Sequence, residues 1–285
     1  MNEEDSEPTV YDYISKYHFP IIGYDQKSGK EILVGTCIIV NLLDRFFLVT
    51  ASHVMNAREN LKDKELWIWN FSDGCKFTIT EDIIGDDSLD LPHHHDIAVV
   101  ELNVSRYGIF KTIDFQRNCF IGLHRIIGTK YFQPALGEDT FLIIAGYPSS
   151  MNKLLKNRYK KPRLLIHSTD HFLGKMSNDV IDELLTISAR WDDENLENKG
   201  ANLPAPQGMS GGGVWVLSNK SEFNPRLYAI SVACLSREKR IVAVKMAVVL
   251  SMIKCFFPDT ILDKVNLPFK HEIVCDKSVK LFCVE

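Results

Sequence analysis

The chain has 285 residues, 45% of them hydrophobic and 25% charged, and its formal net charge is −4. This composition is typical of a folded globular protein and offers no basic surface for a nucleic acid or an anionic membrane. No apolar stretch reaches the roughly 18 residues of a spanning helix, and the acidic start Met1–Asp5 lacks the pattern of a secretory signal. We therefore expect neither a nucleic acid nor a membrane among the partners of this chain.

The seven cysteines are odd in number and scattered, with no Cys-x-x-Cys pair. This usage is typical of buried thiols in a reducing compartment, so it predicts a cytoplasmic protein without a disulfide framework or a zinc site. The three consecutive histidines His93–His95 raise a metal site as an alternative. Neighbouring side chains on an extended chain point to opposite faces, which disfavours a shared ion. We expect no metal and no cofactor.

The first half of the chain reads as a series of short strands. Residues 1–18 are polar and predict a mobile N-terminal arm that chemistry does not need. Residues 19–125 are expected to form a first β-barrel, because apolar and β-branched runs alternate with turn residues. The predicted strands cover residues 19–23, 31–41, 45–50, 66–71, 76–79 and 97–102, and a short helical turn follows Thr50.

The second half repeats this pattern after a poorly patterned stretch at residues 103–138, where we place the boundary between the halves. Residues 126–257 are expected to form a second β-barrel. Its predicted strands cover residues 141–147, 163–167, 184–189, 212–217, 227–235 and 240–244. A helix over residues 247–257 should end before Pro258, and residues 258–285 remain as a tail with one strand at 278–284. Many short strands and a single terminal helix predict an all-β pair of barrels.

One stretch carries the strongest chemical signal. Ser210 stands in the run Gly208–Gly213, whose sequence is GMSGGG, directly before an apolar strand. Glycines allow backbone N–H groups to converge on one point beside the serine hydroxyl, as a nucleophile next to an oxyanion site requires. A glycine-rich tight turn is the alternative. The nucleophile elbow of α/β-hydrolases also fits Gly-x-Ser-x-Gly, but it needs a strand before the serine and a helix after it. Here a loop precedes the serine and a strand follows it.

Two further polar residues lie at strand ends. His53 follows the predicted strand 45–50, and Asp96 precedes the predicted strand 97–102. Together with Ser210 they supply a base, an orienting carboxylate and a nucleophile, which are the three groups that acyl transfer to serine requires. His95 is a rival base because it adjoins Asp96. Adjacent side chains on a strand diverge, so we favour His53.

In these three places the sequence resembles the chymotrypsin-like (trypsin-like) serine proteases. Thr50–Val54 (TASHV), Asp96–Leu102 (DIAVVEL) and Gly208–Gly212 (GMSGG) are similar to the histidine, aspartate and serine boxes of that family, in the same order. The resemblance covers roughly residues 30–257. It implies two six-stranded antiparallel β-barrels with a C-terminal helix, and a serine endopeptidase that acts on a protein or peptide substrate.

The resemblance also implies roles for single residues. Ser210 would attack the scissile carbonyl, with His53 as base and Asp96 as its ionised partner, and the N–H groups of Gly208 and Ser210 would hold the oxyanion. Pro204 would form the floor of the primary specificity pocket. Ser231, Val232 and Ala233 would form the pocket walls, and Ser231 would also be the family's polar residue near the aspartate and the substrate backbone. No acidic residue occurs at 198–221 or 227–235, so we expect cleavage after small or medium uncharged residues.

The chain departs from the secreted branch of the family at three positions. Val54 and Pro206 stand where secreted members place cysteines, and Met209 stands where zymogen-activated members have an acid. The chain therefore resembles the intracellular bacterial and viral branch, which folds in an active form. The long excursion at residues 149–207 leaves room for a regulatory protein partner. The alternatives are a protease-fold binding module without turnover and an esterase-type acyl hydrolase.

Overall fold

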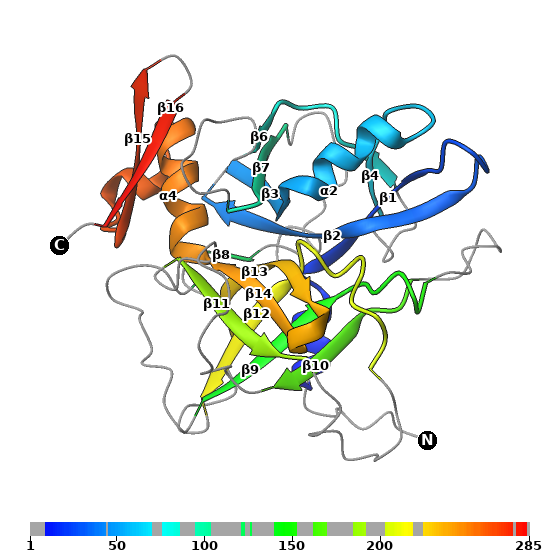
Figure 1. The fold of residues 1–285 in the computed structure, drawn as a ribbon. Coiled ribbons are helices and arrows are strands. Elements are labelled where there is room, and N and C mark those ends of the chain that lie inside the picture. Colours follow the sequence, from blue (N-terminus) through cyan, green and yellow to red (C-terminus); the bar gives the residue numbers. More distant parts are fainter. Residues whose placement is uncertain are drawn as a thin grey trace, which may run out of the picture.

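The computed structural model describes residues 9–43, 45–69, 76–85, 95–103, 121–122, 126, 140–152, 162–169, 185–191, 203–218, 225–275 and 278–283. Two curled antiparallel sheets, one from each half of the chain, lie against each other, and helix α4 and a small hairpin flank them (Figure 1). No helix of the described chain is long and apolar enough to cross a bilayer.

The first sheet contains eight strands in the order β5-β4-β1-β2-β3-β7-β6, with β8 paired to β2 outside this path. All pairs are antiparallel except β2 with β8. The register matters for the site, because Ala51 at the end of β3 lies opposite Ile97 at the start of β7. The strands are β1 His18–Tyr24, β2 Glu31–Leu42, β3 Arg45–Ala51, β4 Trp67–Trp69, β5 Lys76–Thr78, β6 Ile83–Gly85, β7 Ile97–Leu102 and β8 Ile121–Gly122.

The second sheet contains six strands in the order β10-β9-β12-β13-β14-β11. Strand β12 begins directly after the Ser210 loop and pairs with β9 on one side and β13 on the other. The strands are β9 Thr140–Gly146, β10 Leu165–Thr169, β11 Thr186–Arg190, β12 Gly213–Ser218, β13 Arg226–Leu235 and β14 Arg240–Lys245.

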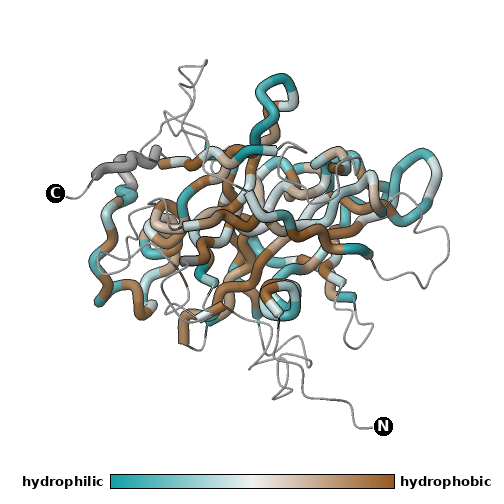
Figure 2. The backbone as a smooth tube through the Cα atoms, turned by 90° about the horizontal axis from the view of Figure 1, so that it is seen from below, coloured by the Kyte–Doolittle hydropathy of each residue, from teal (hydrophilic) through white to brown (hydrophobic). Residues whose placement is uncertain are grey.

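The apolar side chains of the strands fill the space within and between the sheets. Figure 2 shows the hydrophobic stretches crossing the middle of the molecule and the hydrophilic ones on projecting loops. Trp215 of β12 and Phe47 of β3 are among the largest fully buried side chains. Aromatic side chains of this size bury a large apolar area and therefore contribute strongly to the stability of a core.

The chain after β14 forms one long helix and a hairpin. Helix α4 (Met246–Phe256) confirms the predicted helix at 247–257, and the short helix η6 (Ile261–Lys264) follows it. Strands β15 (Phe269–Cys275) and β16 (Ser278–Cys283) form a separate two-stranded sheet beside α4 (Figure 1). The sequence predicted only the second of these strands, because polar residues interrupt the first.

The N-terminal segment differs from the prediction of a mobile arm over residues 1–18. Helix α1 (Val10–Ser15) begins at a capping box in which Thr9 and Asp12 exchange hydrogen bonds. Its residue Ile14 is completely buried, and so is nearly all of Tyr17. The described half of the arm is therefore anchored by apolar packing, while residues 1–8 lie outside the described chain.

The other elements follow the predicted ones closely. Beyond β3, the expected helical turn is α2 (Ser52–Asn56), continued by η1 (Ala57–Asn60), and η5 (Ser236–Glu238) connects β13 to β14. The short strand β6 was not predicted. Residues 70–75, most of the boundary stretch at 103–138 and most of the excursion at 149–207 lie outside the described residues, so the boundary between residues 125 and 126 stays a prediction.

Candidate active site

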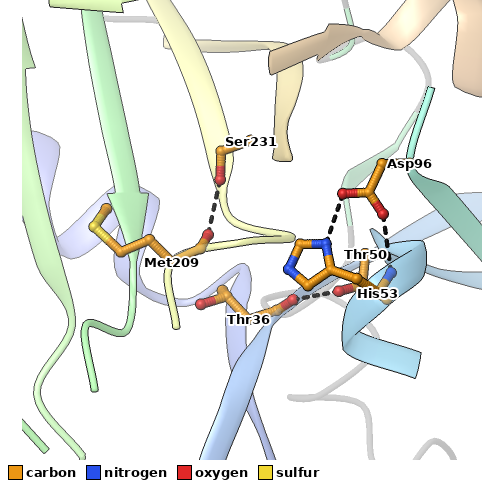
Figure 3. Close-up of polar contacts among 6 residues, drawn as sticks. All are labelled: Thr36, Thr50, His53, Asp96, Met209 and Ser231. Atoms are coloured by element: carbon orange, nitrogen blue, oxygen red, sulfur yellow. Dashed lines mark hydrogen bonds and ion pairs between the residues drawn. The ribbon is translucent and has the colours of Figure 1, made fainter. Parts of the chain in front are cut away.

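Asp96 and His53 meet because of the register between β3 and β7. Each residue lies just beyond its strand, at the end where Ala51 faces Ile97. The Nδ1 atom of His53 lies 2.6 Å from Oδ2 of Asp96, and the backbone N–H of His53 donates to Oδ1 over 2.9 Å (Figure 3). The backbone carbonyl of Asp96 also accepts from the N–H of Ser52 at 2.9 Å. Three hydrogen bonds thus join one aspartate to the first turn of α2.

These bonds explain how a five-residue helix forms at this point. Ala51 occupies the N-cap of α2 and has no side-chain oxygen to accept an N–H of the first turn. Unsatisfied N–H groups at a helix start are costly, and a carboxylate is the acceptor that suits them best. Asp96 supplies it from a distant part of the sequence. Its backbone has a φ of +55°, a left-handed conformation that aspartate tolerates better than most residues.

The contact also fixes which nitrogen of His53 is available for chemistry. An ionised carboxylate accepts hydrogen bonds and cannot donate them. The neutral imidazole that bonds it through Nδ1 therefore carries its proton on Nδ1 and has its lone pair on Nε2. The His53 side chain is 53% exposed and that of Asp96 is 32% exposed. The rival base, His95, is buried, and the structure pairs the carboxylate with His53.

The Ser210 loop has a backbone that only glycine permits at two points. Gly208 and Gly211 have φ values of +91° and +85°. A Cβ atom on Gly211 would overlap the carbonyl oxygen of Thr36 and the hydroxyl of Thr50. Strand–loop contact at this distance excludes every other residue, which accounts for the glycine directly after the serine.

Two threonines fasten the loop to the strands that carry His53. The backbone N–H of Thr36 donates to the Ser210 carbonyl at 2.9 Å, and the Thr36 hydroxyl donates to the Gly208 carbonyl at 2.9 Å. The hydroxyl of Thr50 donates to the carbonyl of Thr36 at 2.7 Å. Because Thr50 precedes His53 by three residues, the loop and the histidine share one hydrogen-bonded support.

The backbone N–H groups of Gly208 and Ser210 have no acceptor among the described residues. Ser210 itself is partly exposed. Within the same residues, no hydrogen bond joins Ser210 Oγ to the ring of His53, a bond that often tightens only when substrate is bound. An oxyanion site needs backbone donors that are not used within the fold, so these two N–H groups remain candidates for one.

Met209 and Ser231 fill the interior side of the loop. Met209 stands where zymogen-activated members of the resembling family have an acid. Its apolar side chain is buried in the core of the second sheet. The hydroxyl of Ser231 donates to the Met209 carbonyl at 2.8 Å (Figure 3). The resemblance placed Ser231 near the aspartate, whereas the structure gives its hydroxyl to the loop backbone.

The expected substrate-binding residues lie on both sides of the loop. Pro204 is half-buried, Val232 is buried and Ala233 is exposed. Strand β13 has a bulge between Ser231 and Ala233. Past Ser231, the edge of β13 that faces β12 has no strand partner within the described chain. Such an edge can receive an extended peptide.

Thr36, Thr50 and His18 support the Ser210 loop from the buried side, and this role was not predicted from the sequence. A polar residue inside an otherwise apolar strand is the only signal they leave in the sequence, because buried polar groups need a partner. Of the predicted metal alternative, His93 and His94 lie outside the described residues. The described chain contains no group of three ligating side chains that could hold a metal.

No protein-family model matches this sequence, and a search of curated proteins finds no match. Among solved structures, the chain is similar to the crystal structure of the scabies mite inactivated protease paralogue S-I1. The TM-score is 0.51 at 13% identity, over 87% of this chain and 98% of that one. This likeness shows the fold alone. It confirms the predicted fold class, a pair of chymotrypsin-like antiparallel β-barrels with a C-terminal helix.

Proposed function

We propose that this chain is a serine endopeptidase with Ser210 as nucleophile, His53 as base and Asp96 as the carboxylate that orients the base. The observation that carries this proposal is that the Asp96 carboxylate accepts two hydrogen bonds from His53, one from the backbone and one from the ring. The strands that lead to His53 also hold the Ser210 loop. A carboxylate on Nδ1 leaves Nε2 of His53 to take a proton.

The chemistry follows from these positions. Nε2 of His53 accepts the Ser210 proton as Oγ attacks the scissile carbonyl carbon, and the oxyanion is bound by the N–H groups of Gly208 and Ser210. The imidazolium then protonates the leaving amine, so that the peptide C–N bond breaks and an acyl-enzyme remains. Water attacks the acyl carbon with His53 again as base, which returns Ser210 and releases the acid.

A peptide has a binding edge beside this serine. Residues 232–235 of β13 continue past the start of β12, so their backbone groups can pair with an extended substrate. We assign the primary pocket to Pro204 with Ser231, Val232 and Ala233, and infer cleavage after small or medium uncharged residues. The absence of an acid at 198–221 and 227–235 leaves a bound Lys or Arg without a counter-charge.

The location and partners of the chain are part of the same proposal. Cys37, Cys234 and Cys255 take part in no disulfide, and burial raises the pKa of the Cys37 thiol. Reduced thiols suit a cytoplasmic enzyme. We propose a protein or peptide as substrate, with a regulatory protein as a further partner of the excursion at 149–207.

Digestion of a mixed peptide library by the wild-type chain and by Ser210→Ala tests the proposal. We expect new peptide ends with the wild type and none with the variant. Hydrolysis of small esters without peptide cleavage would indicate an acyl hydrolase of another kind. Peptide binding without any hydrolysis would indicate a binding module that keeps the protease fold.

A further inference from the structure

His18, at the start of β1, is a buried histidine whose two ring nitrogens both have backbone partners. Its Nδ1 lies 2.9 Å from the carbonyl oxygen of Ile14, and its Nε2 lies 3.1 Å from the backbone nitrogen of Gly213. A carbonyl can only accept and an N–H can only donate, so Nδ1 carries the proton and Nε2 accepts. His18 therefore links helix α1 to the first residue of β12.

The environment keeps this histidine neutral. Burial lowers the pKa of His18 to about 4, because the charged form loses its hydration. A protonated Nε2 would have no lone pair for the Gly213 N–H. The neutral ring can therefore maintain both hydrogen bonds across the physiological pH range.

His18 is also linked through Tyr147 to the other end of the Ser210 loop. Its backbone carbonyl accepts from the hydroxyl of Tyr147 at 3.1 Å. The Tyr147 backbone lies against Gly208, since a Cβ atom there would come within 2.7 Å of the Tyr147 carbonyl oxygen. The Tyr147 N–H donates to the Thr36 hydroxyl at 2.9 Å, and that hydroxyl donates to Gly208. His18 thus bonds Gly213 directly and is linked to Gly208 through Tyr147 and Thr36.

Packing holds the histidine in place from the side of α1. Trp215 of β12 is fully buried, and its ring centroid lies 5.7 Å from that of Tyr17, 5.9 Å from that of His18 and 6.2 Å from that of Tyr13. Ile14 of α1, whose carbonyl bonds the His18 ring, is completely buried. Apolar burial of this kind leaves the His18 ring no alternative rotamer without a cavity.

We propose that His18 is a positioning residue for the Ser210 loop. Its Nε2 accepts the Gly213 N–H and so fixes where the loop ends and β12 begins. Helix α1 then belongs to the machinery that shapes the nucleophile loop. The consequence for catalysis rests on the proposed serine peptidase function, whereas the consequence for the loop itself does not.

Two amide substitutions separate the roles of the ring nitrogens. In His18→Gln the side-chain oxygen takes the position of Nε2 and can accept from Gly213. In His18→Asn the amide reaches only as far as Nδ1, so the Gly213 N–H is left buried without an acceptor. We expect the rate of labelling by a fluorophosphonate probe to fall roughly 10- to 100-fold in His18→Asn, and His18→Gln to recover most of it.

The amide exchange rate of Gly213 is the second measurement, made with the same three proteins without a probe. It should rise in His18→Asn and stay slow in His18→Gln. Equal labelling and equal Gly213 exchange in both variants would overturn the proposal. If the wild type is not labelled, the proposed function fails, and Gly213 exchange alone decides the role of His18.

A third variant covers the case in which His18→Asn does not fold. Tyr147→Phe removes only the hydroxyl that donates to the His18 carbonyl and keeps the ring in the core. We expect labelling to slow in this variant too, and an unchanged labelling rate together with unchanged Gly213 exchange would overturn the proposal.

Discussion

Asp96 bonds His53 twice, once at the ring and once at the backbone, with distances of 2.6 and 2.9 Å. The same carboxylate therefore orients the imidazole and completes the N-terminus of α2. A single residue links the chemistry of the site to its local stability. The two effects can be separated by the choice of substitution.

Asp96→Asn should lower peptide turnover by roughly 10⁴-fold, because an amide can place a donor against Nδ1 and favour the wrong tautomer. It should fold well, since asparagine also tolerates a positive φ and its oxygen can still accept from α2. Asp96→Ala should cost the same activity and about 1 kcal/mol more in unfolding free energy. Kinetic assays and urea unfolding of both variants measure this, and an Asp96→Asn variant of full activity would contradict the role of the carboxylate.

The specificity pocket yields a second prediction. Peptides with Lys or Arg before the scissile bond should be cleaved at least roughly 100-fold less efficiently than those with Ala or Val, because a buried cation would be unpaired. Pro204→Asp should raise kcat/KM for the Lys and Arg peptides. Ala205→Asp, on an exposed neighbour, is the matched control and should change little. Equal effects of the two substitutions would show that Pro204 is not at the pocket floor.

Helix α1 should contribute to stability through one side chain above all. Ile14→Ala should lower the unfolding free energy by roughly 2–5 kcal/mol, the usual cost of emptying a fully buried position. Tyr11→Ala, on the same helix but 51% exposed, should change it by less than about 0.5 kcal/mol. A chain beginning at Tyr17 should lose at least as much stability as Ile14→Ala. Equal melting temperatures for all of these proteins would contradict the anchoring role of α1 and support the mobile arm that the sequence predicted.

Stability should decrease as the pH falls below about 6.5. Burial lowers the pKa of His18 to about 4 and that of His271 to about 4, with His95 adding to the effect on His271. Between the ordinary value and the folded value, the unfolded chain binds more protons, so the unfolding free energy rises with pH in this window. Each histidine should lower the unfolding free energy by about 3 kcal/mol as the pH falls from 6.5 to 4. Neither should affect its pH dependence above about pH 7.

Urea titrations at several pH values measure this loss. Because Ser251 donates its own proton to the Val248 carbonyl, it accepts from Nδ1 of His271 at 2.5 Å. His271→Gln removes this titrating ring. It should lower the slope of unfolding free energy against pH by the equivalent of up to one bound proton, and the contribution of His18 should remain. An unchanged slope in His271→Gln would show that His271 titrates normally in the folded chain.

The sequence was informative where a residue acts through its own strand. The runs at 45–50 and 97–102 predicted β3 and β7. In the structure these strands pair, and His53 and Asp96 are in contact at their ends. The sequence could not show contacts between distant segments. His18 accepts a hydrogen bond from the Gly213 N–H, 195 positions away in the chain. A contact of this kind produces no periodic pattern in the sequence. Helix α1 was missed although Thr9 and Asp12 form a capping-box pattern, because it has only six residues and directly follows the polar run at residues 2–9.

Active-site labelling tests the central claim most directly. The wild-type chain, His53→Ala, His95→Ala and Ser210→Ala are incubated with a fluorophosphonate probe, and intact mass and peptide mapping locate the adduct. The account predicts one adduct on Ser210 in the wild type, near wild-type labelling in His95→Ala, labelling slower by roughly 10⁴-fold or more in His53→Ala, and none in Ser210→Ala. A wild-type chain without an adduct, or an adduct on another residue, would contradict it.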